Sequence, residues 1–206
     1  MIKTITFDFG GVLYDYYGER LLSELASSSK ETIDNLKAVL QGSELDRAHF
    51  RGEIKAAELL EILEDMVGLK MIEDELASAY ANSVEPKEEM FDLVRELNGH
   101  YNLQLYSDTP KILYDRVMTD MPIFDLFSSA TLSFEVGQLK DSPEGHKEVI
   151  KKAGHSAEEI VFIDDREEFV EQASELGIKG IKFTGMSKLI DDLTELGVKL
   201  DGKFDF

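Results

Sequence analysis

The chain has 206 residues, enough for one hydrophobic core or for a core domain with a smaller insert. Its 42 acidic and 22 basic residues give a formal net charge of −20, which argues against nucleic acid or an anionic membrane surface as a partner. Cysteine is absent, which excludes disulfides and thiol catalysis. No segment has the length and apolarity of a membrane span, and the start lacks signal-peptide features, so we expect a cytoplasmic protein.

The first fifteen residues predict a buried strand followed by a sharp turn. Ile5 and Phe7 belong to an apolar run of strand formers, and Gly10 and Gly11 follow as residues that turn the backbone. Asp8 stands just before this break. There its carboxylate would lie at the carboxyl end of a strand, where open α/β sheets bind ligands, or it would serve as a capping or turn residue.

A long helical insert is predicted next. Residues 19–82 show helical spacing of apolar residues and no convincing strand. Ser28 with Glu31 predicts a capping box that opens a helix, and Gly42 ends that helix. The aromatic and acidic stretch Tyr14–Tyr17 predicts a hinge or flap between the strand and the insert.

From Pro86 onward, predicted strands alternate with predicted helices, which indicates a mostly parallel sheet with right-handed crossovers. Ser142 as cap and Pro143 at the first helical position predict a helix that runs through Ala153. Residues 200–206 alternate acidic and apolar side chains and predict an edge strand or a docked or swapped arm. The strands are expected at residues 103–106, 130–134, 160–163 and 178–183.

Polar residues recur where these strands end, and a parallel sheet would bring them together with Asp8. Ser107 by itself is typical of a turn and Lys140 of a solvated lysine. The adjacent pair Asp164 and Asp165 is harder to explain structurally, because like charges repel unless a cation lies near them. Hard divalent cations take oxygen ligands, and Mg²⁺ is the ion we expect at these carboxylates.

In this order and spacing, four motifs resemble those of the haloacid dehalogenase-like hydrolase superfamily, and most of all its Asp-x-Gly-Gly/Asn phosphatase branch, which includes glucose-1-phosphate phosphatases. The resemblance spans essentially the whole chain. It implies a Rossmann-like α/β core domain of residues 1–14 and 86–206 with an inserted helical cap domain of residues 15–85. The motifs are Asp8-Phe9-Gly10-Gly11, Leu105-Tyr106-Ser107-Asp108, Lys140, and Val161-Phe162-Ile163-Asp164-Asp165.

The resemblance also implies roles. Asp8 would be the nucleophile that forms an aspartyl-phosphate, while Ser107 and Lys140 would contact the phosphoryl group as catalytic residues. The expected function is a Mg²⁺-dependent phosphatase acting on a small phosphorylated metabolite, for example a sugar phosphate, as a monomer or homodimer. The implied substrate-binding residues are Gly11, Ser107, Asp108 and Lys140, and the implied metal ligands are Asp8, Gly10, Asp164 and Asp165.

Three positions depart from the superfamily pattern. Gly10 stands where most members carry a second aspartate, the general acid/base, and loss of such a group typically costs about 10²–10⁴ in rate. The Asp-x-Gly branch lacks it too. Asp141 stands where proline is usual, and Phe169 where asparagine is usual. The leaving group would then take its proton from water or another residue, with Glu53 and Asp15 as first candidates.

The sequence is also compatible with other activities. A haloacid dehalogenase-type hydrolase would need no metal, and a phosphonatase would need a Schiff-base lysine, for which Lys55 is the candidate. A catalytically weak phosphate-binding or regulatory member is the non-enzyme alternative. Arg51 or Glu53 would contact substrate or, as we expect, belong to a helix terminus. The histidines show no metal-ligand spacing and are expected on the surface; they are His49, His100, His146 and His155.

Overall fold

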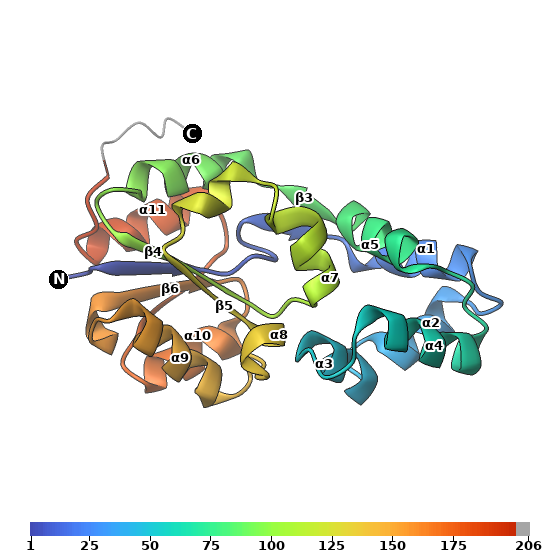
Figure 1. Ribbon diagram of the computed structural model, residues 1–206. Helices are drawn as coiled ribbons and strands as arrows, with labels where there is room; N and C mark the ends of the chain where they lie inside the picture. The colour runs from blue at the N-terminus through green and yellow to red at the C-terminus, as the bar shows by residue number, and fades with distance from the viewer. Residues whose placement is uncertain (201–206) are drawn as a thin grey trace.

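A five-stranded parallel sheet is the central element of the computed structural model, which describes residues 1–200 (Figure 1). The strand order across the sheet is β5-β4-β1-β6-β7, and every neighbouring pair is parallel. This confirms the predicted α/β class with a Rossmann-like core. The strands are β1 (Thr4–Phe7), β4 (Asn102–Ser107), β5 (Ser129–Leu132), β6 (Ile160–Asp164) and β7 (Lys179–Lys182).

Helices cover both faces of this sheet. On one face lie α6 (Glu88–Leu97) and α11 (Met186–Glu195), and on the other lie α9 (Pro143–Ala153) and α10 (Glu167–Glu175) (Figure 1). Shorter elements complete this part: α7 (Lys111–Leu113), the π-helical turn η1 (Tyr114–Met118), the 3₁₀ turns η2 (Pro122–Leu126) and η3 (Ala157–Glu159), and α8 (Ser133–Val136).

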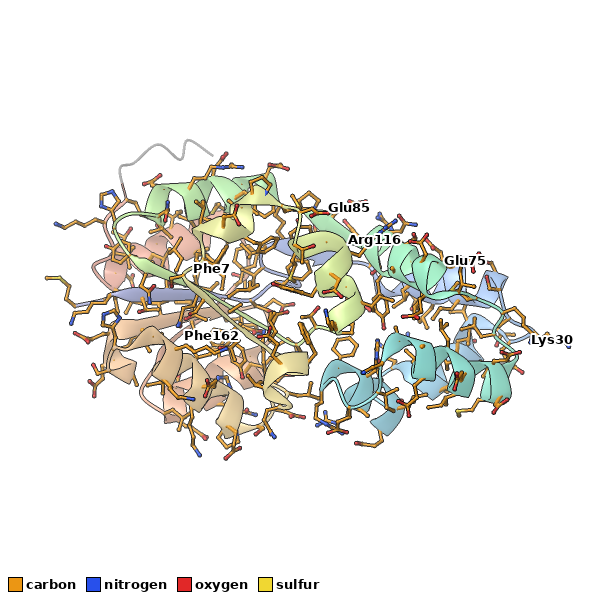
Figure 2. The ribbon with its side chains drawn as sticks, viewed as in Figure 1. Phe7, Lys30, Glu75, Glu85, Arg116 and Phe162 are labelled. Carbon is orange, nitrogen blue, oxygen red and sulfur yellow. The ribbon has the colours of Figure 1, made fainter. Side chains whose placement is uncertain are left out.

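Strand β1 is buried along its whole length although hydroxyl side chains alternate with apolar ones in it. Burial on both faces is expected of a central strand in a parallel sheet. The Thr4 hydroxyl lies 2.9 Å from the His155 ring nitrogen, and the Thr6 hydroxyl donates to the Gln104 amide oxygen at 3.1 Å. The strand therefore holds its position without an unpaired hydroxyl. Phe7, fully buried, marks this interior in Figure 2.

Between β1 and β4 the chain leaves the sheet and forms five helices at one end of the molecule (Figure 1). We call residues 18–82 the helical segment. Its helical character confirms the prediction for this stretch. The helices are α1 (Gly18–Ser27), α2 (Ile33–Leu40), α3 (Glu44–Phe50), α4 (Ala56–Val67) and α5 (Glu73–Asn82). Two short antiparallel strands, β2 (Tyr14–Tyr16) and β3 (Val84–Pro86), join the segment to the rest, so most of the predicted hinge is a strand.

The predicted helix starts had different outcomes. The capping box at Ser28 is wrong, because Ser28 closes α1, and α2 begins after Thr32, whose hydroxyl accepts from the Asn35 amide at 3.3 Å. The start of α9 is confirmed, since the Ser142 hydroxyl accepts from the Glu144 amide. Both cases use the same device, a hydroxyl that satisfies a free amide of the first turn.

Two further predictions concern the ends of elements. The strand expected at 130–134 stops at Leu132, because the next residues turn into α8. Residues 201–206 of the predicted C-terminal arm lie outside the described residues. Within residues 1–200, none of the helices combines the length and apolarity that crossing a bilayer requires.

Candidate active site

Asp8 lies at the carboxyl end of β1, where the predicted turn forms. Its amide donates to the Ile163 carbonyl at 2.9 Å, which keeps the backbone beside β6 for one more residue. One oxygen of its carboxylate, Oδ1, accepts from the Phe9 amide at 2.6 Å. Gly11 then takes a φ of 81° and its amide donates to the Tyr14 carbonyl at 2.7 Å. The backbone around Asp8 is thus fixed on both sides, and the Phe9 amide holds its carboxylate.

Lys140 is buried beside this carboxylate, with 1% of its surface exposed. Its Nζ lies 2.5 Å from Asp8 Oδ1 and 2.7 Å from Asp164 Oδ2. Burial acts to lower the pKa of Lys140, but the charges of Asp8, Asp164 and Asp108 outweigh it and raise that pKa, so the ammonium stays charged. Burial also raises the pKa of Asp8 well above its usual range, against the opposing pull of Lys140. The site has more negative charge than one lysine balances.

Aromatic rings surround the Lys140 ammonium. Its Nζ lies 5.3 Å from the ring centre of Tyr106, 5.5 Å from that of Phe162 and 5.7 Å from that of Phe169. These distances fall within the range of cation–π attraction. Phe169, at the position where the resembled pattern usually has asparagine, therefore contacts the lysine through its ring.

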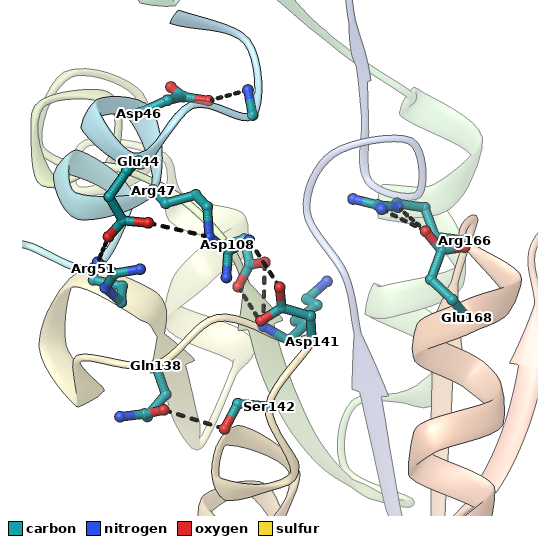
Figure 3. A network of polar contacts seen from close by, with 12 residues as sticks. Glu44, Asp46, Arg47, Arg51, Asp108, Gln138, Asp141, Ser142, Arg166 and Glu168 are labelled. Carbon is teal, nitrogen blue, oxygen red and sulfur yellow. Dashed lines mark hydrogen bonds and ion pairs between the residues drawn. The ribbon is translucent and has the colours of Figure 1, made fainter.

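The backbone of Lys140 is held as firmly as its side chain. Its amide donates to both carboxylate oxygens of Asp108, at 3.0 and 3.2 Å (Figure 3), and its carbonyl oxygen lies 3.1 Å from His146 Nε2. Asp108 is predicted to bind substrate. Its carboxylate instead accepts from the protein's own backbone, although the residue also lines the cavity described below. We infer that Asp108 positions Lys140.

The prediction that all four histidines lie on the surface is wrong for two of them. His49 is 3% exposed and His146 is 0% exposed. His146 packs edge-on against the rings of Tyr106 and Phe162, at centroid distances of 5.2 and 5.7 Å, and burial lowers its pKa to about 4. The sequence around His146 showed only helical spacing, which does not report on a ring contact with distant strands.

Asp8, Asp164 and Asp165 form a carboxylate cluster. Each offers one oxygen, and these three oxygens lie within 4.8 Å of one another. Burial and the charge of Asp164 raise the pKa of Asp165. A hard cation with oxygen ligands would relieve this repulsion, so the donor set fits Mg²⁺. Gly11 faces the cluster, and a Cβ there would collide with the Asp165 carboxylate, whereas Gly10 has open space around its own Cβ position.

Ser107, the remaining predicted catalytic residue, is the last residue of β4. It lies on the strand next to β1 and is 1% exposed. It is absent from the lining of the cavity that contains Asp8. Its contact with a phosphoryl oxygen therefore stays a prediction.

A cavity of about 600 Å³ opens over the carboxylate cluster, and we call it the sheet-edge cavity. The core side supplies Asp8, Phe9, Gly10, Gly11, Asp108, Leu113, Lys140, Asp165, Arg166 and Phe169. The side of the helical segment and its connecting strands supplies Asp15, Tyr16, Gln41, Asp46, Phe50, Tyr80 and Val84.

Sequence reasoning missed Asp46, which lies in the first turn of α3 and lines this cavity. One of its carboxylate oxygens accepts from the Gly42 amide at 3.1 Å (Figure 3). Burial raises its pKa. An aspartate near a helix start is common in any helix, so the sequence carried no signal that this one faces the site.

The other proton-donor and cap candidates lie elsewhere. Glu53 pairs with Arg51 at 2.7 Å, which lowers the pKa of Glu53, and neither residue lines the sheet-edge cavity. Arg51 directly follows α3 and also contacts Glu44 at 2.5 Å (Figure 3), so its helix-terminus role is confirmed. Lys55 lines a separate cavity of about 670 Å³, which removes the geometric basis for a Schiff base over Asp8.

One ion pair joins the helical segment to the Lys140 loop. Arg47 of α3 lies 2.8 Å from a carboxylate oxygen of Asp141 (Figure 3). Asp141 is the residue that replaces the usual proline. This departure therefore gains an ion-pair partner on the helical segment.

The fold and the site define the class. A parallel sheet with an aspartate after its first strand, a buried lysine and an aspartate pair at the same edge is the arrangement expected of a haloacid dehalogenase-like hydrolase. The family model described as haloacid dehalogenase-like hydrolase matches residues 2–179. The chain belongs to this family and is a hydrolase.

Several known proteins are similar to the chain over most of its length. A D-ribitol-5-phosphate phosphatase of Bacteroides thetaiotaomicron is 24% identical over 188 residues, covering 87% of this chain and 90% of the relative. A sesquiterpene phosphatase of Aspergillus oryzae is 25% identical over 198 residues, covering 94% and 96%. A haloacid dehalogenase family enzyme from Bacteroides thetaiotaomicron, solved with magnesium and inorganic phosphate, superposes with a TM-score of 0.81 at 27% identity and covers 92% of this chain and 99% of its own.

Proposed function

We propose that the chain is a Mg²⁺-dependent phosphatase that hydrolyses monoesters of small phosphorylated metabolites through an aspartyl-phosphate on Asp8. The observation that carries this proposal is the Asp8 carboxylate itself. It contacts a buried lysine and lies within 4.8 Å of two further carboxylates on the wall of a cavity. The phosphatase relatives and the solved magnesium and phosphate complex support it. The assignment to the Asp-x-Gly-Gly/Asn branch remains a prediction.

The residues divide the work as follows. Asp8 Oδ1 is held by Lys140 and the Phe9 amide, which leaves Oδ2 to attack phosphorus. The new oxygen–phosphorus bond forms as the ester bond breaks, and the alcohol departs with a proton. Water then hydrolyses the acyl phosphate, which releases inorganic phosphate and restores Asp8. Lys140 stays charged throughout and offsets negative charge at the reacting centre.

Mg²⁺ would be held by Asp8, Asp164 and Asp165 together with the Gly10 carbonyl, and it would neutralise charge on the phosphoryl oxygens. Gly11 lets the backbone approach the Asp165 carboxylate closely. Ser107, the last residue of β4 beside β1, would bind a phosphoryl oxygen. These assignments complete the set of roles for the residues at the sheet edge.

The proton for the leaving group needs a source other than residue 10. Among the residues lining the cavity from the connecting strands and the helical segment, Asp15 and Asp46 carry carboxyl groups. Asp15 is ion-paired with Lys87. Asp46 is half-buried, and this burial raises its pKa, so it holds a proton more readily. We assign the donor role to Asp46, and the helical segment, with its flanking residues 15–85, acts as the cap domain that carries it.

The test is release of inorganic phosphate from a panel of phosphate esters, with Mg²⁺ and with a chelator, for wild type and Asp8→Asn. We expect release that needs both Mg²⁺ and Asp8. Chloride release from 2-chloropropionate without metal would instead establish the dehalogenase alternative. Phosphate binding without turnover under every condition would establish the regulatory alternative.

A further inference from the structure

A second cavity, of about 290 Å³, lies inside the helical segment. Four helices, α1, α2, α4 and α5, contribute leucines to its wall, and we call it the leucine chamber. Protein interiors are close-packed and leave few voids larger than a water molecule, so an apolar space of this size calls for an occupant. The leucines are Leu21, Leu22, Leu25, Leu40, Leu59, Leu63 and Leu76.

The leucine chamber adjoins the sheet-edge cavity. Five residues line both spaces, namely Tyr16, Gln41, Asp46, Phe50 and Tyr80. These five residues form a wall that the two spaces share. A molecule with its charged end at Asp8 and an extended remainder would therefore pass this wall and end among leucines.

The charge of the lining further limits which molecules can occupy the chamber. The chamber lining includes Glu19 and Asp46, and no lysine or arginine contributes to it within the described residues. The whole chain carries a formal net charge of −20. A second anionic group on the substrate would be repelled here, and an apolar chain would not.

We propose that the leucine chamber receives the apolar leaving group of the substrate, so that the preferred substrates are phosphate monoesters of apolar alcohols. This inference rests on the proposed phosphatase function. A water molecule, similar in size to a methylene group, occupies roughly 30 Å³, so the chamber accommodates a chain of about ten carbons. The phosphoryl group stays at Asp8, and Asp46 lines both spaces.

Non-hydrolysable phosphonates test the chamber separately from turnover. Complete burial of one methylene changes affinity roughly fourfold, and half of that free energy gives roughly twofold. Decylphosphonate has six methylenes more than butylphosphonate, so we expect it to bind at least ~50-fold more tightly by calorimetry in the presence of Mg²⁺. Equal affinities of the two phosphonates would overturn the proposal.

Variants locate the effect. Leu63→Phe and Leu22→Phe fill the chamber from α4 and α1, and we expect either to remove most of the preference for decylphosphonate. Leu36→Phe makes the same change at a buried leucine of α2 that does not line the chamber, and it should keep the preference. Equal loss in all three folded variants, checked by circular dichroism, would mean general loosening of the helical segment and would overturn the proposal.

A different result would reject the phosphatase function itself. If p-nitrophenyl phosphate is not hydrolysed with Mg²⁺ in an Asp8-dependent way, the function falls whatever the phosphonates do. If it is hydrolysed and butylphosphonate binds as tightly as decylphosphonate, only the chamber assignment falls. Tighter binding of a polyhydroxylated phosphonate than of decylphosphonate would also overturn it.

Discussion

The sheet-edge cavity and the leucine chamber are neighbouring spaces with different linings. Charged side chains are prominent in the first lining, and leucines in the second. At the sheet edge, Lys140 is fixed by two carboxylates, by three ring faces and through both of its backbone groups. In the chamber, leucines from four helices present apolar surface. Hydrogen bonds and ion pairs are directional and fix a reacting atom, whereas the hydrophobic effect is non-directional and selects by size. The sheet-edge cavity is therefore suited to chemistry, and the leucine chamber to selection of the leaving group.

Asp8→Asn should have the largest effect, and this effect should fall on the chemistry at the sheet-edge cavity. An amide is no nucleophile, so we expect turnover to fall by more than ~10³ for every ester, whatever its leaving group. The change is nearly isosteric, and the Phe9 amide keeps an oxygen to contact. Phosphate release and circular dichroism measure the two properties. Wild-type rates in the variant would exclude Asp8 as nucleophile.

Gly10→Asp should separate proton donation at the sheet-edge cavity from binding of the leaving group in the leucine chamber. Residue 10 has open space at its Cβ position and a backbone that tolerates a side chain, so a carboxyl group fits there. We expect it to raise the rate on alkyl phosphates by about 10–100-fold and the rate on aryl phosphates less, because a poor leaving group needs the proton more.

A series of esters with graded leaving-group pKa, run with wild type and Gly10→Asp, makes this measurement. A flat dependence in wild type with chemistry rate-limiting would show that another residue already supplies the proton. Asp46→Asn should then steepen the dependence. Gly11→Ala is the matched control, since its side chain would meet the Asp165 carboxylate and should lower activity.

His146 links the stability of the chemical region to pH. Its pKa is about 4 in the folded protein, below the ordinary value of 6.5, because burial disfavours the charged ring. Between pH 6.5 and 4 the unfolded chain binds a proton that the folded chain does not, so stability falls as pH falls, by about 1 kcal/mol per unit. His146→Gln should flatten this slope in denaturant titrations, and an unchanged slope would contradict the assignment.

Asp141→Asn should have the smallest effect. It removes one partner of the ion pair that joins the helical segment to the Lys140 loop. The Arg47–Asp141 pair is partly exposed, and such pairs typically contribute 0–1 kcal/mol, so we expect a loss of about 0.5 kcal/mol in unfolding free energy. Activity should change by less than about threefold. Thermal unfolding and phosphate release provide the check. A loss as severe as that of Asp8→Asn would mean that this pair, and not the sheet edge alone, organises the site.

The predictions from sequence held where local pattern carries the information. Alternating strands and helices gave the parallel sheet, because element period and turn residues are written in neighbouring positions. The strand-end motifs predicted that Asp8, Asp164 and Asp165 lie together, since the carboxyl ends of parallel strands share one edge, and Lys140 joins them from the loop before α9. The helix start at Ser142 followed from its cap and from Pro143 at the first helical position.

Tertiary structure decided what depends on packing between distant segments. The burial of His146, the ring of Phe169 under Lys140 and the pairing of Asp141 with Arg47 each join segments far apart in the sequence. Leucines at helical spacing look the same whether they fill a core or line a chamber. Only the crossing of the helices leaves space among them, and only that placement turns Asp46 toward the site.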